Sequence, residues 1–538
     1  MPTDCISYSE TNYFSKLILD YLDKKEDLSP FYNRFPEIGN FEAQIKEKQQ
    51  SFSNENRKVL VESLQQQFKG FDVSEATLAN IEALSKDTTF TITTGHQLNL
   101  FTGPLYFLYK IISVINLTKI LKKEHPEYDF VPIYWMATED HDFAEINYFN
   151  LNGKKFQWNS TEKGAEIDAV GYLSTEGLDE VFELFSAEIG GGEAADHLKS
   201  LFKKAYLEHT NLTEATRYLA NELFKQYGLV IMGAQQAELK KLFVPYAENE
   251  LLEQRSFENT KEKTEKLSNL GYNVQVNPRE INLFYLNNGY RERIIKRDGK
   301  FYVHEKQIER TKDEILAELH ENPQYFSPNV MLRPLYQEVI LPNLCYIGGG
   351  GELAYWLELK DYFEAENVPF PMLLLRNSAL LQSEKQKEKR EKLDISNKEL
   401  FLKQHELINR KVRKISNIDI DFSKQKEHLQ KQFEEMYELA EKTDKSFLGA
   451  VKAQEVKQLK GLDHLEKRLL KAQKRKLKDE VSRIADLQNQ LFPNRSLQER
   501  QTNFSEVYAI YGQELLDTLF EQLNPLEQHF KILTFGTK

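Results

Sequence analysis

The fold is decided by residues 90–142, which read FTITTGHQLNLFTGPLYFLYKIISVINLTKILKKEHPEYDFVPIYWMATEDHD. Residues 90–94 are short and β-branched, as is typical of a strand. Pro104 suits the first turn of a helix, and residues 105–117 give that helix a broad apolar face. A second apolar strand at 130–137 follows. The order strand, helix, strand predicts a βαβ unit, and therefore a parallel sheet with right-handed crossovers.

Outward from this unit, further short apolar runs predict strands at 228–232, 344–347 and 372–375. Parallel strands are buried on both faces, which accounts for their nearly continuous apolar character. Residues 1–85 have helical periodicity, and residues 352–362 predict a helix after a glycine run. Residues 147–172 and 281–303 alternate between polar and apolar and predict inserted β-hairpins. Their turn signals are Asn152-Gly153, Asn288-Gly289 and Asp298-Gly299.

From about residue 382 the composition changes, because Gly and Pro become rare until Pro493 while Lys, Glu and Gln dominate. Leucines recur at steps of seven, at Leu470, Leu477 and Leu491, with Ile484 at the same spacing. This heptad pattern predicts two long antiparallel helices with a break near residues 415–422. The expected domains are a core at 1–380 with inserts at about 147–225 and 275–330, a coiled coil at 381–495, and a segment at 496–538 that packs back on the core.

The composition excludes several functional classes. Lys and Arg number 71 and Asp and Glu number 83, so the formal charge of the 538-residue chain is −12. An acidic chain has no general attraction for nucleic acid or anionic membranes. Only Cys5 and Cys345 are present, as expected for a reducing cytoplasm. The N-terminus has no basic and apolar signal-peptide pattern, and no apolar run approaches the ~18 residues of a membrane span.

Four polar segments follow predicted strands, namely Thr94–Gln97, Glu139–Asp142, Gly348–Glu352 and Arg376–Ser378. Ligands of open α/β sheets bind beyond the carboxyl ends of the strands. We therefore expect these four segments to converge on one edge of the sheet, although they are far apart in sequence.

Each segment suggests a particular chemistry beside a simpler alternative. The Gly95 loop predicts phosphate binding at a helix N-terminus, with His96 near a developing charge, or else an ordinary tight turn. Residues 139–142 hold three carboxylates and an imidazole, which favours proton transfer or cation binding over a solvated acidic loop. His96 and this cluster lack the HExxH or Cys/His spacing of zinc sites, so no metal site is predicted.

The glycine run at 348–351 allows close approach of a bound nucleotide or sugar to the backbone. It matches neither a Walker loop nor GxGxxG, and its alternative is a flexible helix entry. Arg333 and Arg376 lie beside predicted strands. Either guanidinium could bind a carboxylate or phosphate through two hydrogen bonds, or could form a structural ion pair instead.

Four motifs together resemble the bacillithiol biosynthesis BshC family. They are TGHQLNLFTGPLYFLYKIIS (94–113), PIYWMATEDHDFAEIN (132–147), MLRPLYQEVILPNLCYIGGGGELAYW (331–356) and SLQER (496–500). The resemblance extends over about residues 90–510, with the motifs in the family's order. His96 stands where the family often has Gln, and Gly350 where it often has Pro.

The resemblance implies a Rossmann-like core similar to class I aminoacyl-tRNA synthetases and nucleotidyltransferases, with connecting inserts and a coiled coil that promotes dimerisation. It also implies the last step of bacillithiol synthesis, in which L-cysteine is joined to the amine of glucosaminyl-malate. By analogy the route is ATP-dependent through a cysteinyl-adenylate, with magnesium present only together with the nucleotide. The expected chain is a cytoplasmic homodimer that binds these small substrates and neither nucleic acid nor membrane.

The resemblance also assigns roles to residues. Gly95, His96 and Gln97 would hold nucleotide phosphate or substrate, and Gly348, Gly349, Gly350, Gly351, Glu352 and Tyr355 would shape the sugar pocket. Asp140, His141 and Asp142 would bind the glucosamine, with Asp140 or His141 as general base, because an amine must lose a proton before it attacks an acyl centre. Arg333 or Arg376, with Asn377 beside it, would bind the malate carboxylates.

Two other functions stay open from the sequence. A nucleotide-sugar-dependent transferase would also use glycine loops on a parallel sheet. A non-catalytic scaffold of the thiol pathway would use the coiled coil to recruit a partner. A fold alone does not fix a function, so these alternatives depend on the site.

Overall fold

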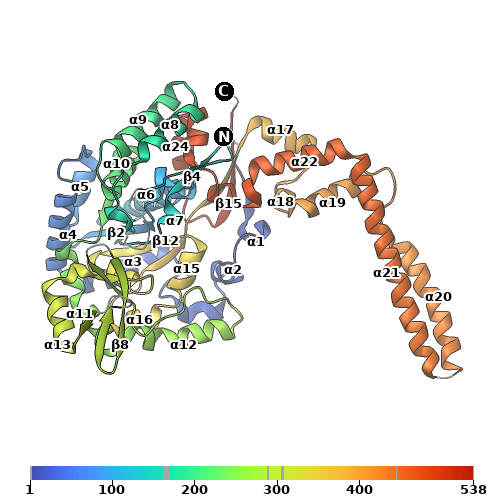
Figure 1. Cartoon of the computed structure of the whole chain (residues 1–538), viewed down its shortest axis with the longest axis horizontal. Coiled ribbons are helices and arrows are strands. Elements are labelled where there is room, and N and C mark those ends of the chain that lie inside the picture. The colour runs from blue at the N-terminus through green and yellow to red at the C-terminus, as the bar shows by residue number, and fades with distance from the viewer. Residues whose placement is uncertain (1–2, 161–168, 288–289, 304–307, 444, 537–538) are drawn as a thin grey trace.

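Five parallel strands form the central sheet of the computed structural model, which describes residues 3–160, 169–287, 290–303, 308–443 and 445–536 (Figure 1). In spatial order they are β13 (Met372–Leu375), β12 (Asn343–Gly348), β2 (Thr89–His96), β3 (Asp129–Met136) and β6 (Val230–Gly233). All four neighbouring pairs are parallel. The predicted α/β class and its parallel sheet are confirmed.

The strand order reverses between β2 and β12. Counted along the chain, the five strands take the spatial order 5-4-1-2-3. Read from the other edge this is 3-2-1-4-5, the order of the first five strands of a Rossmann fold. Helix α6 (Tyr106–Glu124) leaves β2 and returns to β3, as the βαβ prediction requires. The crevice at such a reversal is where doubly wound sheets bind ligands, so the gap between β2 and β12 marks the expected site.

Apolar side chains on both faces of the sheet hold it in place. On one face Phe90 and Ile92 of β2 pack with residues of α6 and with Phe41 and Ile45 of α3 (Phe41–Ser51). A larger cluster on the other face extends into the remaining helices of the body. These helices are α1 (Tyr8–Thr11), α2 (Lys16–Leu22), α4 (Asn54–Gln67), α5 (Glu75–Ala83), α11 (Ala237–Glu253), α12 (Arg255–Asn269), α14 (Arg333–Ile340), α15 (Gly350–Trp356) and α16 (Lys360–Ala365).

The first insert follows β3. It contains α7 (Phe143–Ile146), the hairpin β4 (Tyr148–Leu151) and β5 (Lys154–Gln157), and α8 (Leu178–Ile189), α9 (Glu193–Leu207) and α10 (Leu212–Phe224). The hairpin turns at Asn152-Gly153, where both residues have positive φ as the sequence predicted.

The second insert is an antiparallel sheet with the order β10-β9-β8-β7-β11, followed in the chain by α14. Its elements are β7 (Leu283–Asn287), β8 (Tyr290–Arg297), β9 (Lys300–Val303), β10 (Ile308–Arg310), α13 (Lys312–Glu321) and β11 (Phe326–Pro328). The turn predicted at Asp298-Gly299 is present with positive φ at both residues. The turn predicted at Asn288-Gly289 lies outside the described residues.

A three-stranded sheet joins the two ends of the chain to the origin of the arm. Strand β15 (His529–Phe535) lies between β1 (Thr3–Ser7), which is antiparallel to it, and β14 (Ser378–Ser383), which is parallel to it. The prediction that residues 1–85 are entirely helical is wrong at β1. A short strand has no recognisable pattern when its partner is more than 500 residues away.

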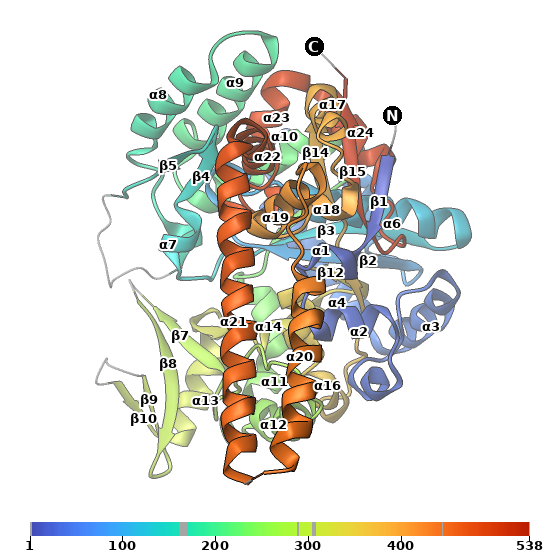
Figure 2. The same cartoon turned by 90° about the vertical axis from the view of Figure 1, so that its right-hand side faces the viewer.

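The arm projects from the body as a helical hairpin of α20 (Ser423–Glu441) and α21 (Lys445–Lys476) (Figures 1 and 2). At its base lie α17 (Glu384–Lys392), α18 (Asn397–Leu400), α19 (Gln404–Ile415) and α22 (Lys478–Leu491). The chain then returns to the body through α23 (Phe504–Tyr511) and α24 (Gln513–Gln522). The antiparallel coiled coil is confirmed, and a break is present between residues 415 and 423. That break separates α19 from α20, however, whereas the antiparallel pair is α20 and α21.

The heptad row lies elsewhere than predicted. Helix α21 ends at Lys476, Leu477 is the N-cap of α22, and Ile484 and Leu491 are buried in the core cluster of the body. The apolar contact inside the arm is made instead by Phe433, Ala440 and Val451, with Leu429, Tyr437 and Leu448 around them. A seven-residue spacing marks an apolar helix face but does not say which neighbour that face meets.

Candidate active site

A cleft of ≈ 470 Å³ lies at the carboxyl ends of the central strands. Pockets that hold small molecules commonly have volumes of about 300–1,000 Å³. The predicted site residues that line it are Gly95, His96, Gln97, Asp140, Arg333, Gly349, Gly351, Glu352, Tyr355 and Arg376. Residues from the ends of β2, β3, β12 and β13 therefore meet in one cleft, as the sequence predicted.

The cleft is more basic than the chain as a whole. Its charged lining consists of five cations, Lys110, Arg291, Arg333, Arg376 and Arg500, and three carboxylates, Glu139, Asp140 and Glu352. In a protein with a formal charge of −12, this local excess of positive charge favours an anionic ligand.

Lys110 and Glu352 form an ion pair at the strand-order reversal. Lys110 Nζ lies 2.6 Å from Glu352 Oε2 and also donates to the carbonyl of Gly95 at 2.6 Å. Glu352 additionally accepts hydrogen bonds from the Tyr346 hydroxyl and the Gly349 amide. Burial opposes ionisation of Glu352, but Lys110 and these donors lower its pKa to about 2. The pair thus joins α6, β2 and α15 at the floor of the cleft.

Gly95 is a strand residue and not part of a loop. Strand β2 continues to His96, and Gly95 pairs with Trp135 of β3. Helix α6 begins only at Tyr106, after a buried segment in which Phe101 packs among other aromatic rings. The Gly95 segment therefore does not lead directly into a helix N-terminus, and its carbonyl is already bound by Lys110.

The glycine run divides into two pairs. Gly349 and Gly351 line the cleft, and a Cβ atom on Gly351 would meet nothing within 4 Å. Gly348 and Gly350 instead contact the protein: a Cβ on Gly348 would lie 2.9 Å from Tyr346, and one on Gly350 3.3 Å from Ile18. The run is thus required partly by packing and partly by access to the cleft.

Arg376 is buried and structurally anchored. Its Nη2 donates to Glu499 at 2.7 Å, and its Nη1 donates to the Asn377 carbonyl and the Ser378 hydroxyl. Within the described part of the chain its Nε has no hydrogen-bond partner. Arg376 is therefore largely a structural ion pair, but it retains one donor at the cleft.

Arg333 is the cation with most capacity for a ligand. Its guanidinium donates to Gln337 Oε1 and to the Tyr355 hydroxyl, both at 3.1 Å, and lies over the ring of Tyr346. Among the described residues no carboxylate lies within ion-pair distance of it. Two of its five N–H groups are engaged by these bonds, and the others can bind a carboxylate or phosphate.

His96 is buried at the end of β2 and packs against the rings of Tyr106 and Phe107. Burial, together with the nearby Lys110, lowers its pKa to about 3, so the imidazole is neutral near pH 7. Its Nε2 has no hydrogen-bond partner among the described residues. A buried ring nitrogen without a partner in a ligand-sized cleft is available to a substrate.

The acidic turn after β3 presents two carboxylates to the cleft. Asp140 accepts hydrogen bonds from Gln97 Nε2 at 2.8 Å and from the His141 amide at 2.7 Å. Although burial opposes ionisation, these bonds and the His141 side chain lower its pKa well below the ordinary value. Asp140 is therefore a fixed negative charge and a weak base. Glu139 Oε2 accepts from Lys240 and Ser327, whereas its buried Oε1 has no described partner.

Three predicted residues have structural contacts outside the cleft lining. His141 is exposed, with Nδ1 3.3 Å from Arg291 Nη1 and 3.6 Å from Asp140. Asp142 caps α7 by accepting from the Glu145 amide. Asn377 connects Ser113 of α6 to the carbonyl of Asn524. For Asp142 and Asn377 these contacts support the structural alternative.

Sequence reasoning missed four charged residues of the site. Lys110 had a visible signal, because it is the single charged residue between Gln97 and Lys119 in an otherwise apolar helix. Arg500 lies in the SLQER motif, which was noted without a role. Arg291 belongs to the second insert, and Lys240 reaches Glu139 from α11. Nothing in their local sequence indicates these last two, because their roles depend on tertiary contacts.

The donors of the cleft bear on the expected cofactor. The free N–H groups of Arg333 and Arg376 fit phosphate oxygens as well as carboxylates.

Within the described ranges, no three His, Cys, Asp or Glu side chains are grouped so that they could hold a metal ion. In the same ranges, no helix has both the length and the apolar character that crossing a membrane requires.

Comparisons with known proteins agree with this architecture. Residues 1–377 match the family described as "Bacillithiol biosynthesis BshC, N-terminal Rossmann-like domain", and residues 379–535 match "Bacillithiol biosynthesis BshC, C-terminal coiled-coil domain". Three similar relatives each carry the name "Putative cysteine ligase BshC". The protein of Christiangramia forsetii is 71% identical over 536 residues, covering 100% of both chains. That of Flavobacterium johnsoniae is 59% identical, covering 99% of this chain and 100% of the relative. That of Cytophaga hutchinsonii is 37% identical, covering 97% and 96%.

Proposed function

The chain belongs to the bacillithiol biosynthesis BshC family, and we propose that it is a cysteine ligase that joins L-cysteine to the amine of glucosaminyl-malate. The reaction forms an amide and would take place in the cytoplasm. The observation that carries the proposal is the cleft itself, in which guanidinium donors lie together with one carboxylate oxygen, Glu139 Oε1, that has no described partner. A substrate with an anionic end and an amino-sugar end fits this arrangement.

The anionic end of the substrate is proposed to bind Arg333. Malate contributes two carboxylates, and a guanidinium binds carboxylate through two parallel hydrogen bonds. Arg376 Nε offers one further donor, and Arg500 adds positive charge at the same cleft. Arg333 is held by Gln337 and Tyr355, so its orientation is set before the substrate arrives.

The amino-sugar end is proposed to lie against Glu139 and Asp140. Glu139 Oε1 is a buried acceptor without a described partner, and an ammonium or hydroxyl group would satisfy it. Because its pKa is strongly lowered, Asp140 serves as a fixed charge for the amine and not as its base. Glu139 takes the place of Asp140 and His141 as the proposed acceptor of the amine proton. The neutral Nε2 of His96 accepts a further hydrogen bond from the substrate.

Amide formation requires an activated carboxyl group, and ATP is the proposed source of that activation. When bound, the nucleotide would convert the carboxylate of cysteine into an acyl group with a good leaving group. Its phosphates would be held by the same positive lining, to which Arg500 belongs. The protein's part is to bind the substrates in contact, to orient the amine and to receive its proton.

A product assay with defined substrates tests this function. Purified protein, ATP, cysteine and glucosaminyl-malate are expected to give the cysteinyl product by mass spectrometry, together with AMP and pyrophosphate. Arg333→Met should raise KM for glucosaminyl-malate by about 10- to 100-fold, because a charge-assisted hydrogen bond contributes about 1.5–3 kcal/mol. Release of UDP from a UDP-sugar in place of AMP would identify a glycosyl transferase and contradict the ligase assignment.

We also propose that the arm pairs two copies of the chain. Five large apolar side chains of the described part of the arm are exposed, namely Leu439 by 60%, Leu465 by 53%, Phe447 by 49%, Met436 by 44% and Val456 by 43%. Exposed apolar groups on one element favour association. Sedimentation equilibrium should give twice the 63.0 kDa chain mass, and a mass of one chain would contradict this pairing.

A further inference from the structure

A buried ion pair lies beneath the cleft, outside its lining. Lys48 of α3 and Glu338 of α14 meet at 3.0 Å, with 1% and 0% of their side chains exposed. Moving two charges out of water has a large desolvation penalty, and such pairs often stabilise a fold no better than apolar residues would. Stabilisation of the fold therefore does not by itself explain why these two charges are buried here.

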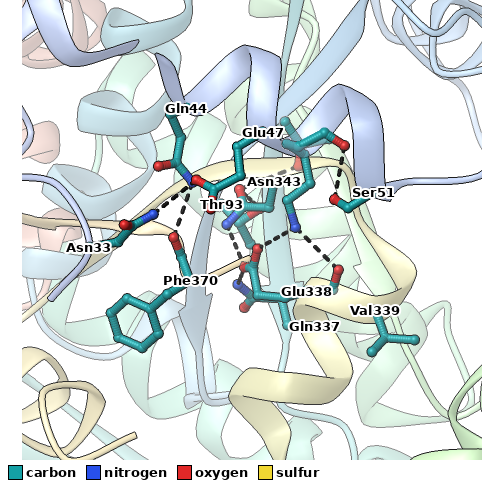
Figure 3. A network of polar contacts seen from close by, with 12 residues as sticks. Asn33, Gln44, Glu47, Ser51, Thr93, Gln337, Glu338, Val339, Asn343 and Phe370 are labelled. Carbon is teal, nitrogen blue, oxygen red and sulfur yellow. Dashed lines mark hydrogen bonds and ion pairs between the residues drawn. The ribbon is translucent and has the colours of Figure 1, made fainter. Parts of the chain in front are cut away.

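The carboxylate of Glu338 is fully hydrogen-bonded. Its Oε2 accepts from Lys48, and its Oε1 accepts from Asn343 Nδ2 at 2.7 Å and Gln337 Nε2 at 3.0 Å (Figure 3). Asn343 is fixed in turn by the Thr93 hydroxyl at 2.9 Å. The pair thus has one fixed geometry, set by α3, α14, β12 and β2.

Gln337 carries this geometry to the cleft. A carboxylate only accepts hydrogen bonds and a guanidinium only donates them. The Gln337 amide must therefore direct its NH₂ group to Glu338 and its oxygen to Arg333 Nη1, which lies 3.1 Å away. The ionised state of Glu338 and the presence of Arg333 both determine this one orientation.

We propose that Lys48, Glu338 and Gln337 form a positioning relay that holds Arg333 ready to bind a dicarboxylate in the cleft. The proposal rests on the proposed function only for the identity of that dicarboxylate. Lys48 acts through Glu338, and Glu338 acts through Gln337. None of the three lines the cleft, so they are positioning residues and not ligands.

Among the contacts of Glu338, Lys48 makes the largest contribution in favour of the charged carboxylate. Burial raises the pKa of Glu338, and Lys48 opposes that rise. Removal of Lys48 would raise the pKa of the carboxyl group further, and a protonated Glu338 could donate a hydrogen bond itself. The Gln337 amide could then reverse and present its NH₂ group to Arg333, where two donors would face each other.

Binding of L-malate measured by calorimetry tests the relay without requiring turnover. Lys48→Met and Gln337→Leu are each expected to raise the Kd for L-malate by about 10-fold, because the hydrogen bond to charged Arg333 is lost or reversed. Lys263→Met is the matched control, since Lys263 is also buried and ion-paired, with Asp361 at 2.7 Å, but has no contact with the relay. Its Kd should equal that of the wild type.

The kinetic readout separates positioning from general damage. In the product assay, Lys48→Met and Gln337→Leu should raise KM for glucosaminyl-malate while kcat stays within twofold. The relay would be overturned if Lys48→Met and Gln337→Leu bound L-malate with the same Kd as the wild type. It would also be overturned if Lys263→Met lost as much affinity as they do, or if the wild type did not bind L-malate. A wild type that binds L-malate but forms no cysteinyl product would overturn the ligase and leave the relay standing.

Discussion

The side chains of the ion pairs around the cleft are less exposed than those of the arm. Arg376 and Glu499 have 4% and 1% of their side chains exposed, while Lys426 and Asp463, which join α20 to α21, have 27% and 49%. A buried charge that loses its partner is strongly unfavourable, but an exposed one is stabilised by water. The loss of one charged partner should therefore destabilise the body strongly and the arm only slightly.

Removing a buried partner should give the largest effect. Lys110→Met removes a buried cation, 4% exposed, from Glu352, whose side chain is 26% exposed, so we expect unfolding to require about 2–3 kcal/mol less free energy at pH 7. Because the folded pKa of Glu352 is about 2, this stabilisation is present above the ordinary carboxyl pKa and is lost as the pH falls towards 2. Urea unfolding of the variant and the wild type at pH 7 and at pH 3 measures the loss of unfolding free energy at each pH. Equal losses at the two pH values would show that the ion pair is not their source.

A smaller effect on the free energy of unfolding should come from the neutral imidazole of His96 in the same cleft. The folded pKa of His96 is about 3, against an ordinary value of 6.5. Below pH 6.5 the unfolded chain therefore binds a proton that the folded chain does not, and stability falls as the pH is lowered. Between pH 7 and pH 5 this amounts to about 2 kcal/mol.

His96→Asn should remove this part of the pH dependence. Urea unfolding of the variant and of the wild type is measured at pH 7 and at pH 5. The quantity compared is the change in unfolding free energy between the two pH values. A uniform loss of stability in the variant does not affect it. Parallel slopes would mean that His96 is protonated in the folded protein at pH 5.

The smallest effect is expected in the arm. Lys426→Met removes the contacts to Asp463 and Glu466, which are 2.6 and 3.0 Å long. Exposed pairs are screened by salt and contribute little, so the urea midpoint should stay equal to that of the wild type. A midpoint shift as large as that of Lys110→Met would remove the distinction between the two regions.

Much of the fold was predictable because its signals are local. The apolar runs at β2, β3 and β12 mark buried parallel strands, and parallel topology alone places the residues after them on one edge. Strand β1 and the destination of Ile484 and Leu491 were not predictable. Each depends on a partner far away in the sequence, and a local pattern does not identify that partner.

The candidate site was predictable in position more than in detail. Asp140 and Gly349 reach the cleft as expected, since each follows a strand end, whereas Arg333, predicted beside a strand, reaches it from the first turn of helix α14. His141 and Asp142 belong to the same turn, but their side chains leave it in other directions. Adjacent residues in a turn do not share a direction, so sequence proximity overstates how many of them can serve one ligand.

The three-stranded sheet at the origin of the arm has a consequence for biosynthesis. Strand β15 is the last strand of the chain, and it lies between β1, the first, and β14, which precedes the arm. Chains begin to fold at the N-terminus while they are still being translated. Here the connection between β1 and the helical arm cannot close until the ribosome has delivered the residues of β15, His529–Phe535. A truncated product would lack this central strand.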